Sequence, residues 1–133
     1  MIISTPRLRL RCWAQADRAV FAAMHADSQV MHDCGGPISR SESVGSHVQI
    51  GWRLMRHAWG FGYATEAARA ALTDTFVRVG LDAVIAYTAA DNLRSQAVMT
   101  RLKMRRDPSR DFTSDYAAIK GWRGLVWEAR SSG

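Results

Sequence analysis

The order of hydrophobic patterns along this chain of 133 residues predicts an α/β fold. Segments with strand patterns alternate with segments of helical spacing over most of the chain. A glycine turn, Trp59 to Thr65, separates the second strand pattern from the longest helical pattern. The hydrophobic content of 47% is ample for a packed core, and the length is near that of one ordinary domain. We therefore expect residues 1–133 to form a single domain.

The N-terminal part predicts one strand and one helix. Residues 8–13 alternate between apolar and polar side chains, which indicates a strand with its arginines on the solvent face. Asp17 is expected to cap a helix. The helix would carry Val20, Phe21 and Met24 on one face. A turn is expected at Gly35-Gly36-Pro37.

The middle of the chain predicts a strand–turn–helix–strand unit. Residues 48–54 form the second strand pattern, and apolar residues then follow helical spacing from Ala64 to Val79. Gly80 suits the position just after a helix. Residues 83–88 form a short apolar run typical of a buried strand. If the two strands are parallel neighbours, a right-handed crossover places the glycine turn at the carboxyl edge of the first.

The C-terminal part predicts a helix and a last strand. Asn92 or Ser95 is expected to begin the helix, which runs through Leu102. After Asp107-Pro108 we expect a polar loop, followed by a strand around Leu125-Val126-Trp127.

The glycine turn predicts an anion site. Gly60 and Gly62 let the main chain turn tightly and approach a ligand closely. The helix that follows begins with unpaired N–H groups and a dipole that favours an anion. A phosphate-bearing cofactor is therefore the first hypothesis. A Rossmann site is a poor match because the third glycine is missing, and the Gly-Lys-Ser/Thr of a P-loop is absent.

The formal net charge of +6 raises nucleic acid as an alternative partner. The cations are mostly arginines spread along the chain, without a nucleic-acid-binding motif, so a solvated basic surface is favoured. We find no apolar run of membrane-spanning length and no secretory leader pattern at the N-terminus. Cys12 and Cys34 lack metal or disulfide-framework spacing, so we expect a cytoplasmic protein without a metal.

Several motifs together resemble the GNAT acyltransferases, and within them the RimJ/RimL-like N-acetyltransferase branch. The resemblance touches most of the chain and is specific as an ordered set. The motifs are T-P-R-L-R-L-R at residues 5–11, I-G-W-R-L at 50–54, W-G-F-G-Y-A-T-E-A at 59–67, N-L-R-S-Q-A-V-M at 92–99 and M-R-R-D-P at 104–108.

The resemblance implies a mixed central sheet flanked by helices, and an enzyme that transfers the acetyl group of acetyl-CoA to a primary amine by direct attack. The amine would belong to a protein N-terminus or to a small molecule, and the sequence does not name it. Acetyl-CoA is implied as cosubstrate. The residues implied in binding it are Trp52, Arg53, Leu54, Trp59, Gly60, Phe61, Gly62, Tyr63, Ala64, Thr65, Asn92 and Ser95.

Roles follow from the family pattern. The N–H groups of residues 59–64 would hold the pyrophosphate, and the pantetheine arm would run along residues 52–54, where one N–H would polarise the thioester carbonyl. Phe61 stands where the branch usually has a basic or polar residue, so we expect one phosphate contact to be missing. Glu66, in the first helical turn, is explained by dipole stabilisation and capping alone.

The groups that would transfer protons are less clear from the resemblance. Met99 occupies the place of the family's tyrosine acid and cannot donate a proton. Ser95 is a candidate acid for the leaving thiolate, and a local cap of its helix is an equal interpretation. Gln49 replaces a carboxylate base found in some relatives. His47 is a weak candidate for the base, because a loop histidine is more often merely solvated.

The chain also departs from the family pattern. A helix and two strands are expected between residues 41–43 and Val48, but only a few residues separate them. We therefore expect a sheet shortened in its N-terminal half, with an unpaired edge on residues 48–54. Either the first strand pairs there or a second copy of the chain does, as a homodimer. Lys103 stands in place of a helix-ending glycine, at a cost of roughly 1 kcal/mol.

Three functions remain open from the sequence. The first is the acetyltransferase. The second is a CoA-binding protein of the same fold with weakened catalysis. The third is a basic protein that binds nucleic acid or ribosomes. The glycine turn favours the first two.

Overall fold

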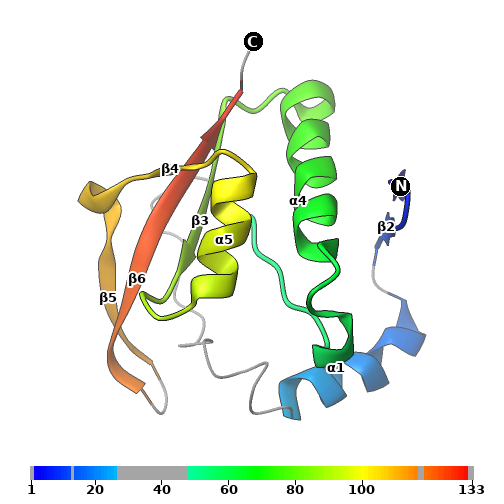
Figure 1. Cartoon of the computed structure of the whole chain (residues 1–133), viewed down its shortest axis with the longest axis horizontal. Coiled ribbons are helices and arrows are strands. Elements are labelled where there is room, and N and C mark those ends of the chain that lie inside the picture. The colour runs from blue at the N-terminus through cyan, green and yellow to red at the C-terminus, as the bar shows by residue number, and fades with distance from the viewer. Residues whose placement is uncertain (1, 13, 27–47, 117–118, 132–133) are drawn as a thin grey trace.

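The computed structural model describes residues 2–12, 14–26, 48–116 and 119–131 (Figure 1). Its main sheet has four strands: β3 (Ala83–Thr88), β4 (Arg105–Arg106) and β5 (Phe112–Tyr116) each pair with the long strand β6 (Ile119–Arg130), and all three pairings are antiparallel. The helices α4 (Tyr63–Asp74) and α5 (Leu93–Arg101) lie beside this sheet. The sequence-based prediction of a mixed fold of strands and helices is confirmed.

The core lies between the two helices and one face of the main sheet. Buried side chains from α4, β3, α5, β6 and the segment between α5 and β4 form one cluster, comprising Leu72, Val84, Ala86, Met99, Met104 and Ala129. A smaller cluster on the other face of the sheet joins Ile85 and Val126, with Tyr87 and Phe112 packed against it. Strand β3 is therefore covered on both faces, which explains its continuous apolar run.

The helix predicted from residue 64 to residue 79 is confirmed. Helix α4 continues into a π-helical turn, Thr75–Val79, and Gly80 ends it with φ at 82°. The main-chain N–H of Gly80 donates to the Thr75 carbonyl at 3.0 Å. A positive φ here suits glycine, because a side chain would be strained in this conformation.

The strand predicted over residues 48–54 is only partly present. One parallel bridge joins Gln49 to Ile85, and the chain from Gly51 to Met55 is extended without a regular ladder. Residues 48–50 run parallel to β3, as the sequence predicted. The predicted strand, residues 48–54, was too long. Residues 41–47, on which the predicted deletion depends, lie outside the described residues, so the deletion stays a prediction.

The N-terminal strand does not pair with residues 48–54 in the described structure. Strand β1 (Ile2–Ser4) pairs antiparallel with β2 (Arg9–Arg11) as a separate two-stranded sheet. Figure 1 shows this pair on the other side of α4 from the main sheet. The sequence predicted a strand at residues 8–13 and missed β1.

Helix α1 (Arg18–Ala26) follows a 3-10 turn, Gln15–Asp17. Asp17 was expected as the cap itself. Instead its carboxylate accepts from the Ala14 N–H at 2.7 Å and from both terminal nitrogens of Arg11 at 2.8 Å. These contacts lower the pKa of Asp17 to about 2. Val20, expected on the inner face, is 55% exposed.

The loop predicted after Pro108 was wrong in part. A short 3-10 turn, Pro108–Arg110, leads directly into β5, which forms a hairpin with β6. The prediction of a last strand around Val126 is confirmed, and that strand is longer than expected. Lys103 has φ at 60°, so the left-handed conformation predicted for it is also confirmed.

Candidate functional site

The candidate site begins where residues 48–54 leave strand β3. The Ile50 N–H donates to the Ile85 carbonyl at 2.8 Å, and the Ile85 N–H donates to the Val48 carbonyl at 3.0 Å. Beyond Ile50, no main-chain bond joins the two segments in the described structure, and the N–H groups of Trp52 and Leu54 have no acceptor there. The two segments part here, leaving main-chain donors on one of them unused.

Helix α5 lies beside this divergence. The Trp52 indole N–H donates to the Ser95 hydroxyl oxygen at 3.2 Å. The Ser95 main-chain N–H donates to the Asn92 side-chain oxygen at 3.1 Å, so Asn92 caps the helix. The predicted residues Trp52, Asn92 and Ser95 are thus brought together from two distant segments.

The glycine turn connects this segment to α4. Gly60 and Gly62 have φ of 85° and 79°, a region that favours glycine. Helix α4 starts at Tyr63 without a side-chain cap, and the Glu66 N–H donates to the Gly62 carbonyl at 3.0 Å. The earlier N–H groups of α4 are left for a ligand or for solvent.

Two observations describe the space and the polar groups at the turn. A Cβ placed on Gly60 would meet nothing within 4 Å, and one on Gly62 would meet only Arg7 Nη2, at 3.4 Å. The Thr65 hydroxyl, on a residue 7% exposed, has no hydrogen-bond partner among the described residues. Such a buried group without a partner among the described residues is uncommon in folded proteins. A phosphate-bearing cofactor therefore fits this turn.

Aromatic side chains hold the turn in place. The Trp59 indole N–H donates to the Leu54 carbonyl at 3.0 Å, and the Arg94 guanidinium lies 4.3 Å from the centre of the Trp59 ring. Phe61 is 55% exposed and stacks on Tyr63, with 5.4 Å between the ring centres. Phe61 offers no charge, as the sequence indicated, but Arg94 brings a cation from another element.

The structure gives Glu66 a contact that the sequence-based interpretation missed. Its carboxylate accepts from the Thr5 hydroxyl, from the Arg7 N–H at 3.0 Å and from Arg7 Nε at 2.7 Å. The bonds from Thr5 and then Arg7 hold the pKa of Glu66 below its ordinary value. Glu66 therefore ties the β1–β2 turn to the start of α4, a role beyond dipole stabilisation. The motif at residues 5–11 contained the signal, but its partner could not be read from the sequence.

The structure describes three of the four residues considered for proton transfer. The Ser95 hydroxyl borders the divergence, and because it accepts from Trp52, its own proton is free to be donated. Met99 is 1% exposed within the core and carries no transferable proton. Gln49 takes part in the parallel bridge. His47 lies outside the described residues.

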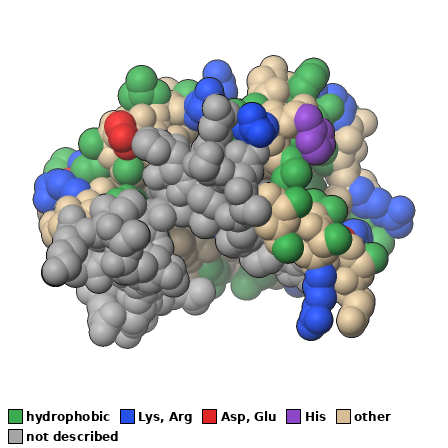
Figure 2. Space-filling model, turned by 90° about the horizontal axis from the view of Figure 1, so that it is seen from below, with side chains coloured by type: hydrophobic (Ala, Val, Ile, Leu, Met, Phe, Trp, Pro, Cys, Tyr) green, Lys and Arg blue, Asp and Glu red, His purple; other side chains and the backbone are tan. Residues whose placement is uncertain are grey.

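The remaining predicted cofactor residues are Arg53, which is exposed, and Ala64, which is half-buried. Figure 2 views the molecule from below Figure 1 and shows the described Lys and Arg side chains spread around this face. On this face the described Lys and Arg side chains do not gather into one patch of the kind that a nucleic-acid footprint requires. Within the described part, no group of acidic, His and Cys residues could hold a metal, and no helix is long and apolar enough to span a membrane.

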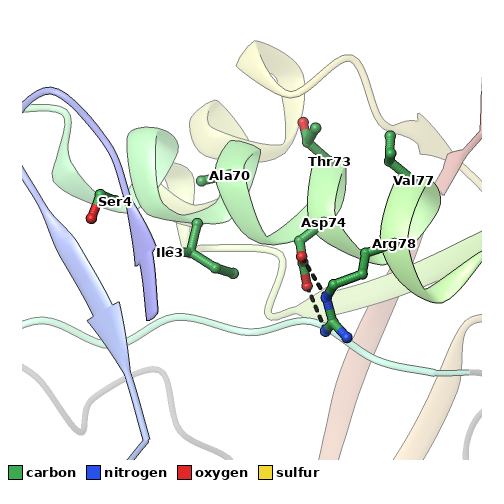
Figure 3. A pocket seen from close by; sticks show the side chains of 7 residues that line it. All are labelled: Ile3, Ser4, Ala70, Thr73, Asp74, Val77 and Arg78. Carbon is green, nitrogen blue, oxygen red and sulfur yellow. Dashed lines mark hydrogen bonds and ion pairs between the residues drawn. The ribbon is translucent and has the colours of Figure 1, made fainter. Parts of the chain in front are cut away.

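A separate hollow of about 410 Å³ lies between β1 and the far half of α4 (Figure 3). The Arg78 guanidinium, paired with Asp74 at 2.8 Å, closes one side of it. None of the glycine-turn residues lines it. Its lining residues are Ile3, Ser4, Ala70, Thr73, Asp74, Val77 and Arg78.

Comparison with known proteins decides the family. A family model described as an acetyltransferase (GNAT) domain matches residues 34–105, more than half of the chain. The chain belongs to the GNAT acetyltransferase family. The matched range contains the divergence at Ile50, the glycine turn and helix α5. The resemblance found in the sequence is thereby confirmed.

A curated relative and several solved structures agree with this GNAT assignment. The uncharacterized N-acetyltransferase YnaD of Bacillus subtilis is 38% identical over 64 residues. The match covers 47% of this chain but only 38% of the length of that relative.

The structural neighbours show the GNAT fold. A GNAT acetyltransferase from Bacillus anthracis superposes with a TM-score of 0.80 at 22% identity, covering 98% of both chains. RimJ from Mycobacterium smegmatis, solved with CoA-disulfide, gives a TM-score of 0.56 at 23% identity, covering 62% of this chain and 39% of RimJ. The microcin C7 self-immunity acetyltransferase MccE, solved with acetyl-CoA and AMP, gives 0.52 at 16% identity over 62% of this chain and 46% of that chain.

Proposed function

We propose that this chain binds acetyl-CoA and transfers its acetyl group to a primary amine. The observation that carries the proposal is the divergence of residues 51–54 from β3 directly before an uncapped glycine turn. Among the described residues, the N–H groups of Trp52 and Leu54 have no main-chain acceptor, and the first N–H groups of α4 have none within the helix. The donors on the diverging segment suit an extended arm that ends in a thioester. Those at the start of α4 suit a pyrophosphate. The complexes of RimJ with CoA-disulfide and of MccE with acetyl-CoA support this choice of ligand.

The residues of the chain would act as follows. Bound acetyl-CoA supplies a thioester as the acyl donor. A main-chain N–H in the segment Trp52–Leu54 stabilises the negative charge that develops on the carbonyl oxygen during attack by a neutral amine. The new C–N bond forms as the C–S bond breaks. The Ser95 hydroxyl gives its proton to the leaving sulfur and regains one from solvent, while the amine nitrogen loses its proton to water.

The binding step is tested by calorimetry on two matched glycine variants. Gly62 and Gly80 have φ of 79° and 82°, so alanine at either position strains the main chain by a similar amount, about 1 kcal/mol. Only Gly62 lies at the proposed phosphate site. We expect Gly62→Ala to weaken acetyl-CoA binding strongly and Gly80→Ala to leave it close to wild type. Equal affinity in both variants would contradict the assignment of the turn. Wild type should also melt at a higher temperature with acetyl-CoA present.

A CoA-binding protein with weakened catalysis is the second candidate, and the buried Met99 favours it. Met99 is 1% exposed and carries no transferable proton, so Ser95 is the candidate that could protonate the leaving thiolate. We expect Ser95→Ala to lower kcat by at least about tenfold while the KM for acetyl-CoA changes little. Thr100→Ala removes an exposed hydroxyl from the same helix and is the control. Tight binding without turnover on a panel of amines would establish this second candidate instead.

A further inference from the structure

Arg7 meets its carboxylate differently from three other arginines of the described chain. Arg11, Arg78 and Arg106 each place two guanidinium nitrogens on their acids. Arg7 uses only Nε, which lies 2.7 Å from Glu66 Oε1. Of the five N–H donors that a guanidinium carries, the four on Nη1 and Nη2 donate to no residue in the described structure.

The reason lies in the second oxygen of Glu66. Oε2 is occupied by the Thr5 hydroxyl and by the main-chain N–H of Arg7, at 3.0 Å for the latter. A bidentate pairing of the arginine is therefore blocked. The Thr5 hydroxyl also accepts from the Leu8 N–H at 2.9 Å, which fixes the β1–β2 turn that carries Arg7.

The free end of Arg7 is directed to the glycine turn. Its Nη2 lies 3.4 Å from the position that a Cβ on Gly62 would take. Its Cζ lies 4.8 Å from the centre of the Tyr63 ring, which restrains the guanidinium. The Arg7 side chain remains 47% exposed and is thus accessible to a ligand.

We propose that Arg7 is a ligand-binding residue that contacts a phosphate of acetyl-CoA, and that Glu66 positions it. The inference rests on the proposed binding of acetyl-CoA. A guanidinium suits a phosphate because its N–H groups match two phosphate oxygens. Because Glu66 and Tyr63 already hold this side chain, little conformational freedom is lost on binding. Arg7 thereby supplies a cation from the N-terminal hairpin, in addition to Arg94 on α5, at a turn where Phe61 carries no charge.

Calorimetry with acetyl-CoA tests the contact. We expect Arg7→Gln to raise the dissociation constant about tenfold, the loss of one charge-assisted hydrogen bond to an anion. Arg78→Gln is the matched control, since it removes an arginine from a carboxylate pair at the other end of α4 with 54% of the side chain exposed. The ³¹P resonances of the bound diphosphate should shift in Arg7→Gln and not in Arg78→Gln. Equal affinities and unchanged resonances would overturn the role of Arg7.

Glu66→Gln tests whether Glu66 positions Arg7, because a positioning role and a purely electrostatic role predict opposite changes in the affinity for acetyl-CoA. Removing a negative charge beside an anion site should tighten binding if Glu66 acted only through its charge. We expect weaker binding, because the amide cannot accept all the bonds that hold Thr5 and Arg7; tighter binding would overturn the inference. Arg7→Lys, which keeps the charge, should restore part of the affinity that Arg7→Gln loses.

Melting of each variant without ligand reports any loss of folding. If wild type itself fails to bind acetyl-CoA, the proposed function fails; if wild type binds and Arg7→Gln binds equally well, only this inference fails.

Discussion

Single residues in this protein are constrained chiefly by what lies opposite them on another element. Gly124 of β6 is buried, and a Cβ built on it would stand 2.3 Å from Phe112 Cζ on β5. Phe112 is half-buried and packs edge-on against Tyr87, with 5.1 Å between the ring centres. The absence of a side chain at residue 124 therefore lets an aromatic ring close over the strand.

Replacing Gly124 with alanine should destabilise the fold. The added methyl would lie well inside contact distance of three ring carbons of Phe112, so the ring or the strand must shift, at about 1–3 kcal/mol. Urea denaturation should show this loss. Gly51→Ala is the control, because a Cβ there meets nothing within 4 Å and the position has no positive φ. A loss no larger than that of the control would show that Phe112 moves aside freely.

At the scale of elements, the ends of helices connect the core to the site. Helix α5 begins at a cap from Asn92 and ends with Lys103 in a left-handed conformation. The Met104 N–H donates back to the Met99 carbonyl at 3.0 Å, and both methionines are buried in the core cluster. This is the arrangement of a helix end that normally uses glycine. The chain keeps it with lysine because burial of Met104 on the core fixes the turn.

Lys103→Gly should stabilise the protein by about 1 kcal/mol, because glycine adopts the left-handed conformation without the clash of a Cβ. Lys103→Ala removes the same charge but keeps the clash, and should leave the free energy of unfolding near that of wild type. Thermal or urea unfolding of the three proteins measures the difference. Equal stability of the glycine and alanine variants would mean that the turn is not strained.

For the molecule as a whole, an ionic network around Asp111 joins the start of β5 to β4 and β6. The Asp111 side chain, 5% exposed, accepts from two nitrogens of Arg106 at 2.6 Å, from Arg123 at 3.3 Å and from the Val126 N–H at 3.0 Å. The bonds from Arg106, and then from the Val126 N–H, hold the pKa of Asp111 below its ordinary value of about 3.8.

The stability of the fold should therefore fall in acid. A carboxyl whose pKa is lowered by folding stabilises the native state above its unfolded pKa, near 3.8, and this stabilisation is lost as the pH falls through the folded pKa. Asp111→Asn should cost about 1–3 kcal/mol at pH 7 and flatten the decline below pH 4, measured by urea unfolding across pH. Asp74→Asn, at an exposed pair on α4, is the control and should change little. An unchanged pH profile in Asp111→Asn would contradict the network's role.

The sequence by itself determined the helix from residue 64 with its glycine end, the buried strand Ala83–Thr88 and the glycine turn, and it placed the start of the next helix at Asn92 or Ser95. Each depends on local periodicity or on a conformation open to few residue types. Only the tertiary structure decided that residues 48–54 leave the sheet after one bridge, that β1 pairs with β2 apart from the main sheet, and that Glu66 directs Arg7 to the glycine turn. These features join segments up to 61 residues apart. Such contacts are set by packing between elements, which the spacing of residues along the chain does not encode.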